Sequence, residues 1–290
     1  MTIGNQQMRE EFAENRVYIK GVELRPEIVF ECGQAFRFLP KDEGYQGVAR
    51  GRALYIESMA DGFFLEPCSR EEYEAIWKDY FDLNLSYEKI LKELSRDPIV
   101  KKAAAYSRGM RLLNQEPFET LITFIVSANN NVGRIRKIVQ AIAREAGKPI
   151  RFRGETLYTF PSPEALADVS PERLRELGAG YRAEYIAKTA GMVAAGEGLE
   201  ALAGLPYGEA KAALQKFPGV GPKVADCILL FSMHKKNAFP ADVWIRRVLR
   251  EMYGVELKSD RALSAFVQNT FGEYGGIAQQ MLFHYARTRP

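Results

Sequence analysis

The spacing of apolar residues divides the chain into two parts. Between residues 16 and 66, apolar and polar positions alternate or form short apolar runs, as they do in β-strands. The Asp61-Gly62 pair is a turn signal between two of these runs. We therefore expect a small antiparallel sheet, with strands at 16–24, 35–38, 47–49, 54–58 and 63–65.

From Ser69 onward the apolar residues recur at helical spacing. Ser69 and Glu72 form a capping box, in which hydroxyl and carboxylate satisfy backbone amides of the first helical turn. Tyr73, Trp77 and Tyr80 then follow on one helical face. Further helices are expected at 86–94, 97–113, 117–128, 131–146, 182–195, 207–216, 222–234, 242–253, 259–271 and 275–287, and two short ones begin at Pro163 and Pro171.

This pattern predicts an α+β N-terminal part with a small antiparallel sheet, followed by an all-helical body. We place the boundary near residue 115, which gives an N-terminal domain at 1–115 with flanking helices and a helical domain at 116–290. The composition is ordinary for a globular protein, since 47% of the 290 residues are apolar and 27% are charged. The longest apolar stretches are too short to span a membrane, and we find no secretion signal.

Cysteine and charge distribution add two expectations. Cys32, Cys68 and Cys227 are spaced too widely for a disulfide framework or a zinc site, which fits a reducing, intracellular setting. The net charge is only +3, but residues 131–153 hold seven basic residues and one acidic residue, and residues 216–250 hold seven and two. These segments fit a basic face for nucleic acid, and equally a solvated charged surface.

The most informative segment joins two of the expected helices. Pro218 ends the first helix and Pro222 suits the first turn of the next. Gly219 and Gly221 permit positive φ, so the backbone amides of Gly219, Val220 and Gly221 are expected to be free to hold a DNA phosphate at a helix N-terminus. A tight helix connection that binds nothing is the ordinary explanation of such a turn.

Two residues near this turn have the chemistry of a catalytic pair. Lys223 lies in the first helical turn, where the helix dipole favours the neutral, nucleophilic amine. Asp242 opens a later helix, where a simple N-cap is the alternative. Together, these features resemble the helix-hairpin-helix superfamily of DNA base-excision glycosylases. The resemblance implies that Lys223 attacks C1′ of the damaged nucleotide to form a Schiff base, with β-elimination to follow, and that Asp242 stabilises positive charge on the sugar.

Further motifs make the resemblance specific to the 8-oxoguanine DNA glycosylase family. In Cys32-Gly-Gln-Ala-Phe-Arg-Phe38, the family places a glycine carbonyl, here that of Gly33, in the base pocket. 8-Oxoguanine carries a hydrogen on N7 where guanine has a lone pair, so a fixed carbonyl accepts from one base and repels the other. Near the C-terminus, the resemblance implies that Gln279 reads the Watson–Crick edge of the flipped base. Cys227 and Phe283 are implied to sandwich that base.

Two other motifs relate to the space that the flipped base leaves. In the segment 127–134, SANNNVGR, the resemblance implies that Asn129 and Arg134 contact the orphaned cytosine, which favours C opposite the lesion. Tyr181, in a glycine-containing turn, is similar to the family's wedge, which enters the duplex and stabilises its kink. Each residue also has an ordinary explanation as a helix end, turn or core residue, but their joint order favours the family.

The chain departs from the family pattern at two positions. Trp244 stands where eukaryotic members usually carry a histidine that contacts a phosphate, and His284 occupies a place where small residues are familiar. The resemblance implies no required cofactor, and without a cysteine quartet no iron–sulfur cluster. The resemblance allows an ion only at backbone carbonyls, those of Gln215, Phe217 and Val220.

We therefore expect a bifunctional DNA glycosylase and AP lyase of base-excision repair that removes 8-oxoguanine, preferably opposite C, from double-stranded DNA. An alkylated-purine glycosylase of the same superfamily and a non-catalytic helix-hairpin-helix DNA-binding protein are the alternatives. We expect a monomer that does not bind membranes. Its expected location is the cytoplasm, with the nucleoid, if the source is bacterial or archaeal, and otherwise intracellular or nuclear.

Overall fold

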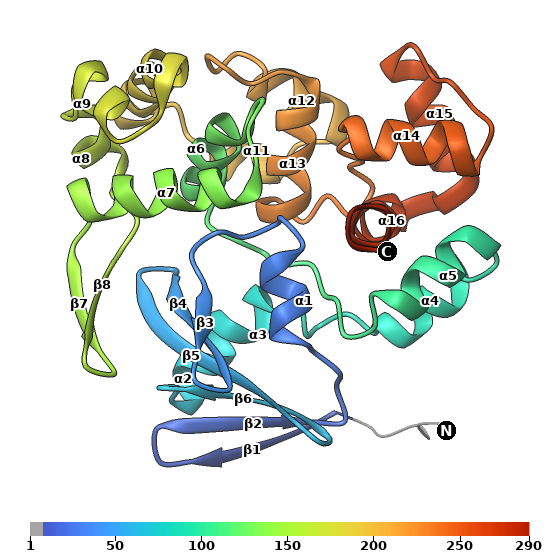
Figure 1. The fold of residues 1–290 in the computed structure, drawn as a ribbon, viewed down its shortest axis with the longest axis horizontal. Coiled ribbons are helices and arrows are strands. Elements are labelled where there is room, and N and C mark those ends of the chain that lie inside the picture. Colours follow the sequence, from blue (N-terminus) through green and yellow to red (C-terminus); the bar gives the residue numbers. More distant parts are fainter. Residues whose placement is uncertain (1–7, 290) are drawn as a thin grey trace.

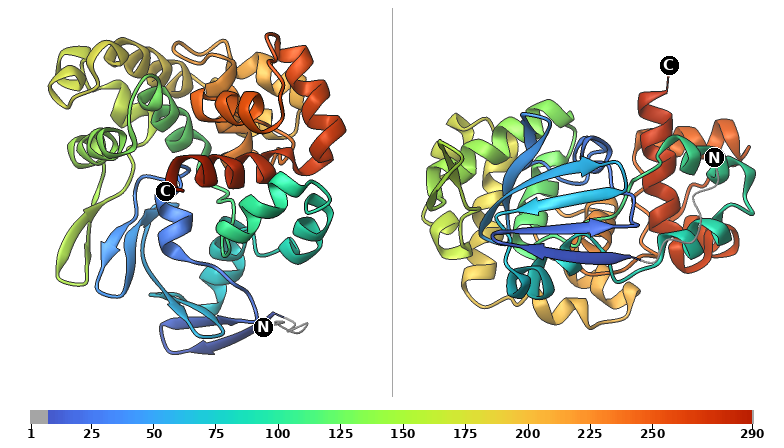
Figure 2. Two further views of the ribbon diagram at one scale, coloured as in Figure 1. Left: turned by 45° about the vertical axis from the view of Figure 1, so that its right-hand side comes forward. Right: turned by 90° about the horizontal axis from the view of Figure 1, so that it is seen from below.

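The computed structural model describes residues 8–289, in which an antiparallel sheet lies beneath a body of helices (Figure 1). The sheet has six strands in the order β1-β2-β6-β5-β4-β3. Figure 2 shows these strands side by side when the molecule is seen from below. The strands are β1 (Arg9–Ala13), β2 (Arg16–Lys20), β3 (Leu39–Lys41), β4 (Gly44–Ala49), β5 (Arg52–Met59) and β6 (Gly62–Glu66).

Most of the helices that follow the sheet form the body and confirm the expected fold class (Figure 1). The first helical segment after the sheet instead buries Tyr73, Trp77 and Tyr80 in the core of the sheet. No helix within residues 8–289 is long and apolar enough to cross a membrane. The helical elements after the sheet are α2 (Arg70–Glu72), η1 (Tyr73–Trp77), α3 (Lys78–Tyr80), α4 (Tyr87–Leu94), α5 (Pro98–Tyr106), α6 (Pro117–Ser127), α7 (Val132–Ala146), α8 (Pro163–Ala167), α9 (Pro171–Glu176), η2 (Gly180–Arg182), α10 (Ala183–Ala194), α11 (Glu200–Ala203), α12 (Tyr207–Leu214), α13 (Pro222–Ser232), α14 (Val243–Met252), α15 (Asp260–Phe271), η3 (Gly272–Tyr274) and α16 (Gly275–Thr288).

The N-terminal part differs from the sequence expectation at one helix and at several strands, among them β3, which was not foreseen. The helix α1 (Pro26–Glu31) lies between the sheet and the body, where the sequence suggested no helix. It is too short for helical periodicity to be visible. The expected strand at 35–38 is an irregular segment instead, and β1 was not foreseen. The expected strand at 16–24 ends at Lys20, because the chain turns at Gly21 with a φ of 73°.

Two further differences lie within the body. The expected helix at 97–113 ends at Tyr106, and Gly109 follows with a φ of 83°. The chain from there to Glu116 has no regular secondary structure. A hairpin of β7 (Pro149–Phe152) and β8 (Glu155–Tyr158) was also missed. Figure 1 shows that it extends from the body alongside the sheet, where Lys41 and Gln46 both contact Glu155.

Buried apolar side chains form two clusters, and α1 contributes to both. Ile28 and Cys32 belong to the cluster of the helical body, whereas Val29 and Phe30 belong to the cluster that includes the buried residues of the sheet. The helices α4 and α5 precede residue 115 in sequence but bury their apolar residues in the cluster of the body. The packing of the cores therefore does not divide the chain at residue 115. The domain boundary near that residue stays a prediction.

Replacing Phe30 tests the role of α1 in the sheet core. Phe30 is fully buried and its ring stacks on that of Phe38, with centroids 4.2 Å apart. We expect Phe30→Ala to lower the free energy of unfolding by about 3–5 kcal/mol, because it removes buried contacts and leaves a cavity. Urea denaturation measures the change. The control Leu39→Ala, at a side chain that is 39% exposed, is expected to change stability by less than about 0.5 kcal/mol.

Candidate active site

The residues expected to form the catalytic pair and the base pocket all line one cavity. They come from the end of α1, from α13, from the start of α14 and from α16, which meet near the centre of the molecule (Figure 1). The cavity has a volume of about 40 Å³. Its lining residues are Gly33, Phe124, Lys223, Cys227, Phe231, Pro240, Asp242, Gln279, Gln280 and Phe283.

Lys223 is presented at the cavity by the first turn of α13. All residues of this helix from Val224 to Ser232 are buried, so the helix has little freedom to move. The side chain of Lys223 is half-buried, and its Nζ lies 5.5 Å from the centre of the Phe124 ring on α6. The amine therefore stands at the junction between the apolar interior and the cavity. Cys227 follows one helical turn later on the same face.

Asp242 caps α14 and faces the same cavity. One of its carboxylate oxygens accepts a hydrogen bond from the amide of Ile245 at 2.9 Å. Burial raises the pKa of this carboxyl group above its ordinary value, and the hydrogen bond from Ile245 and the charge of Lys223 act in the opposite direction. The N-cap explanation and the catalytic explanation therefore apply to the same side chain, because one oxygen caps the helix while the group lines the cavity.

The thiol of Cys227 is an apolar wall of the cavity rather than a second nucleophile. Burial raises its pKa to about 11, and the nearby Lys223 opposes the shift. At neutral pH the group is therefore an uncharged thiol. An uncharged thiol is suited to pack against a flat ring, which is the role that the family resemblance implies for Cys227.

Two polar groups give the cavity its hydrogen-bonding character. Gln279 is buried, and its Nε2 donates to the carbonyl of Pro240 at 3.1 Å. Its Oε1 is buried and accepts no hydrogen bond within the described residues, so it favours a ligand with an N–H donor. Gly33 has a φ of 84°, and a Cβ there would lie 3.4 Å from both Phe283 Cε1 and Arg287 Nη1. Only glycine fits this position without strain.

The hairpin before α13 agrees only in part with the sequence expectation. Gly219 has a φ of 83°, and a Cβ there would approach Tyr185 Cδ2 to 2.9 Å. Gly221 instead has a φ of −86°, so it does not use the positive φ that a glycine permits. The amide of Val220 is not free, because it donates to the carbonyl of Phe217 at 3.1 Å. In the described chain, the amides of Gly219 and Gly221 make no backbone hydrogen bond.

The three residues assigned to the orphaned base and the wedge form a separate cluster. Tyr181 is 58% exposed, and Asn129 and Arg134 are also exposed. Asn129 has a positive φ of 48°, which Asn tolerates better than most residues. The Tyr181 hydroxyl lies 3.5 Å from the carbonyl of Ala128, the residue directly before Asn129. Arg134 lies in the first turn of α7, which begins three residues after Asn129.

The sequence interpretation missed Arg182, which builds this second cluster. Arg182 is buried, and its guanidinium donates to the carbonyls of Ala128 and Asn129. It therefore ties the turn that carries Tyr181 to the loop that carries Asn129. The only signal in the sequence was an arginine directly after the tyrosine. The partners lie more than fifty positions away, so the local pattern did not reveal them.

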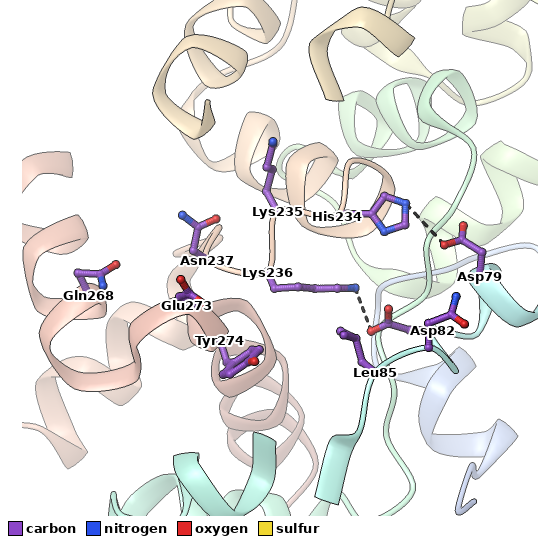
Figure 3. A pocket seen from close by; sticks show the side chains of 11 residues that line it. Asp79, Asp82, Leu85, His234, Lys235, Lys236, Asn237, Gln268, Glu273 and Tyr274 are labelled. Atoms are coloured by element: carbon purple, nitrogen blue, oxygen red, sulfur yellow. Dashed lines mark ion pairs between the residues drawn. The ribbon is translucent and has the colours of Figure 1, made fainter. Parts of the chain in front are cut away.

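A larger cavity lies beyond the C-terminal end of α13 and is separate from this site (Figure 3). Its volume is about 590 Å³. Lys236 enters it from the body and pairs with Asp82 at 3.0 Å, while His234 Nε2 lies 3.8 Å from the carboxylate of Asp79. His234 and Lys236 thus already face acidic residues across the junction between the two parts of the chain. We therefore place the active site at the smaller cavity.

The expected absence of a cofactor is not tested by the structure, and it stays a prediction. Within residues 8–289, no group of three or more His, Cys, Asp or Glu side chains is arranged to hold a metal ion. The backbone carbonyls named for a possible ion have lone pairs that no hydrogen bond occupies. Those of Gln215 and Val220 accept no hydrogen bond among the described residues, and that of Phe217 accepts one from Val220, which leaves it a second lone pair.

Comparisons with known proteins cover nearly the whole chain. Residues 16–121 match the family model of the N-terminal domain of 8-oxoguanine DNA glycosylase. Residues 122–271 match the model of the HhH-GPD superfamily of base excision DNA repair proteins. Both matched regions contribute to the cavity, since Gly33 lies in the first and Lys223, Cys227 and Asp242 lie in the second.

Individual relatives are similar over most of their length. The chain is 37% identical to a probable N-glycosylase/DNA lyase of Methanothermobacter thermautotrophicus over 75% of each chain. It is 34% identical to an N-glycosylase/DNA lyase of Arabidopsis thaliana, over 90% of this chain and 77% of the relative. The 8-oxoguanine glycosylase/lyase of Clostridium acetobutylicum, in complex with double-stranded DNA containing cytosine opposite 8-oxoG, superposes with a TM-score of 0.92 at 37% identity. That match covers 97% of this chain and 98% of the other.

Asp242 is expected to cost stability rather than supply it. Its pKa is raised by burial, so at neutral pH the ionised carboxylate disfavours the folded state relative to the unfolded chain. We expect Asp242→Asn, which keeps a capping oxygen, to melt at the same temperature as the parent protein or higher at pH 7. The difference is expected to shrink as the pH falls through the raised pKa, because the parent carboxyl group then takes up its proton.

The control Asp242→Ala removes the cap and is expected to cost about 1 kcal/mol of stability. Thermal melts of the three proteins at several pH values measure both effects. A large loss of stability in Asp242→Asn at pH 7 would contradict this account of the carboxylate.

Proposed function

Since the chain belongs to the 8-oxoguanine DNA glycosylase family, we propose that it excises 8-oxoguanine opposite cytosine through a Schiff base on Lys223. The protein is a DNA glycosylase with AP lyase activity. One observation carries the finer proposal. The amine of Lys223, the carboxylate of Asp242 and the groups proposed to read the base line a single cavity, although they come from positions 33 to 283 of the sequence.

The reaction begins when the damaged nucleotide leaves the duplex, because its sugar cannot be reached inside the stack. The neutral amine of Lys223 attacks C1′, and the bond from C1′ to N9 of the base breaks. The base leaves with the bonding electron pair and takes up a proton. The carboxylate of Asp242 stabilises the positive charge that develops on the sugar, at a burial where such an interaction is stronger than in water.

Strand cleavage follows from the same covalent bond. Loss of a further proton and opening of the sugar give an imine between Lys223 and C1′. The imine acidifies the hydrogen on C2′, and removal of that proton expels the 3′ phosphate by β-elimination. Water finally releases the lysine. The amine that breaks the glycosidic bond is therefore the same group that makes nicking possible.

Recognition of the base rests on two hydrogen-bond acceptors. The carbonyl of Gly33 accepts from the hydrogen on N7, which guanine lacks. The unpaired Oε1 of Gln279 accepts from the donors on the Watson–Crick edge. One buried hydrogen bond made or lost is worth about 1–3 kcal/mol, or roughly 10- to 100-fold in discrimination.

Contacts to the rest of the duplex come from the hairpin before α13 and from the cluster that contains Tyr181. The amides of Gly219 and Gly221 are proposed to hold a phosphate, and Tyr181 to fill the gap in the stack. Asn129 and Arg134 contact the orphaned cytosine. Trp244 cannot replace the two-nitrogen ring of a histidine at a phosphate. The other departure, His284, is engaged elsewhere, since its Nδ1 lies 2.9 Å from Ser107 Oγ.

A cation at the hairpin carbonyls would strengthen the phosphate contact. The carbonyls of Gln215, Phe217 and Val220 would hold it, and its charge would lie beside the amides of the hairpin. The residues described above carry out the base-excision chemistry without it. We also propose that the protein acts as a monomer. Its proposed location is the compartment that holds the DNA, which is the nucleoid in a bacterial or archaeal cell and otherwise the nucleus.

Trapping with borohydride tests the nucleophile. Borohydride reduces the imine to a stable amine, so the protein is expected to become covalently attached to a duplex that contains 8-oxoguanine opposite C. We expect Lys223→Gln to form no such adduct, because the amide is not nucleophilic. The matched control Lys216→Gln, at an exposed lysine of the same hairpin, is expected to trap like the parent. Gel analysis measures the adduct, and trapping by Lys223→Gln overturns the assignment.

Arg134 is expected to set the preference for the opposite base. Arginine donates to the N3 and O2 edge of an orphaned cytosine, whereas adenine does not present the same acceptors. We expect Arg134→Ala to reduce the ratio of excision rates opposite C and opposite A by about tenfold. Lys137→Ala, at an exposed position on the same helix, is expected to leave the ratio unchanged. Single-turnover excision from the two duplexes measures the ratio, and a parental ratio in Arg134→Ala rejects the assignment.

A further inference from the structure

The backbone just before Gly33 is held by two side chains of α16. The last carbonyls of a helix lack partners within the helix, and α1 ends directly before Gly33. The carbonyl of Glu31 accepts a hydrogen bond from the guanidinium of Arg287. The carbonyl of Cys32 accepts from Gln280 Nε2 at 2.9 Å. The two peptide groups preceding Gly33 are therefore fixed by a helix more than 240 residues away in sequence.

The same two residues stand on either side of Phe283. Gln280, Phe283 and Arg287 are three and then four positions apart, so they share one face of α16. The guanidinium carbon of Arg287 lies 5.2 Å from the centre of the Phe283 ring. Arg287 Nη1 also lies 3.4 Å from the point that a Cβ of Gly33 would occupy. Arg287 thus contacts both the ring and the turn that enclose the cavity.

The backbone after Gly33 is anchored independently of α16. Gln34 is fully buried, and its Nε2 donates to the carbonyls of Val29 and Arg111 at 3.0 and 2.8 Å. Its Oε1 accepts from the amide of Leu113 at 2.9 Å. This side of the turn is part of the protein interior. The position of the Gly33 carbonyl relative to α16 therefore depends on the contacts of Gln280 and Arg287.

In this arrangement the Nε2 of Gln280 and one Nη of Arg287 are engaged by backbone carbonyls. Gln280 is buried with its Nε2 on the Cys32 carbonyl, although it also lines the cavity. Arg287 binds backbone and packs on Phe283. Their contacts bind the turn that carries one recognition group to the helix that carries Gln279 and Phe283. The carbonyl of Gly33 is thereby held at a fixed position relative to Gln279 and Phe283.

We propose that Gln280 and Arg287 are positioning residues that set the discrimination between 8-oxoguanine and guanine by fixing the Gly33 carbonyl. The inference rests on the proposed function. A hydrogen bond weakens steeply with distance and angle, and so does the repulsion between a carbonyl and the N7 lone pair of guanine. Loosening the turn therefore weakens acceptance of the damaged base and relieves rejection of the normal one.

The test measures the two affinities in a protein that does not cut. In a Lys223→Gln background, dissociation constants are measured for duplexes that contain 8-oxoguanine or guanine opposite C. We expect Gln280→Met and Arg287→Met, which keep volume but remove the donors, each to reduce the ratio of the two affinities by about tenfold. Arg287→Lys keeps a donor and is expected to recover part of the ratio.

A second readout separates positioning from general damage. With Lys223 present, cleavage of a duplex with a preformed abasic site needs no base recognition, so it is expected to fall by much less than the release of 8-oxoguanine. The control Arg136→Met removes the 2.9 Å ion pair to the side chain of Glu31 but leaves its carbonyl held by Arg287. It is expected to keep the parental ratio.

The outcomes distinguish this inference from the function on which it rests. A parental affinity ratio in both methionine variants overturns the positioning role, and so does an equal loss of abasic-site cleavage and base release. If Gln280→Met does not fold, the Arg287→Met and Arg287→Lys pair decides alone, since Arg287 is only partly buried. A parent protein that releases no 8-oxoguanine rejects the proposed function itself.

Discussion

The burial of α13 fixes where the reactive amine can lie. Its residues from Val224 to Ser232 are enclosed by the body, and α6 and α12 pack against it. A helix held in this way presents its first turn at one place only, and that turn carries Lys223. Asp242 reaches the same cavity from the cap of α14. The apolar interior thus supplies both the placement of the amine and the burial that raises the pKa of its partner.

The helix α1 links the sheet to the helical body through apolar packing and through hydrogen bonds to its last carbonyls. Its apolar side chains enter both cores, and its terminal carbonyls are satisfied by α16 and by Gln34. A buried carbonyl without a partner would cost free energy, so these contacts stabilise the fold. They also place Gly33 opposite Phe283. In this site, the hydrogen bonds that stabilise the junction are the ones that shape the recognition surface.

Local spacing predicted which residues of the site share a helical face, whereas their roles at the base were implied by the family resemblance. Lys223 and Cys227 share one helical face by spacing, as do Gln279 and Phe283. Pro218 and Pro222 mark the hairpin in the sequence, and the structure places a turn there with Gly219 at a φ of 83°. The expectation failed where a detail depends on neighbours. The amide of Val220, which was expected to be free, donates to the carbonyl of Phe217.

The sequence by itself determined the order of strands and helices in outline, the hairpin and the chemical types that belong to the reaction. These are properties of short segments, in which helix periodicity, capping and turn chemistry act between residues a few positions apart. Only the tertiary structure decided that α1 is a helix, that Arg182 ties the wedge to the Asn129 loop, and that Gln280 and Arg287 hold the turn before Gly33. Those contacts satisfy backbone carbonyls across long separations, and no local pattern records which distant side chain will reach a given carbonyl.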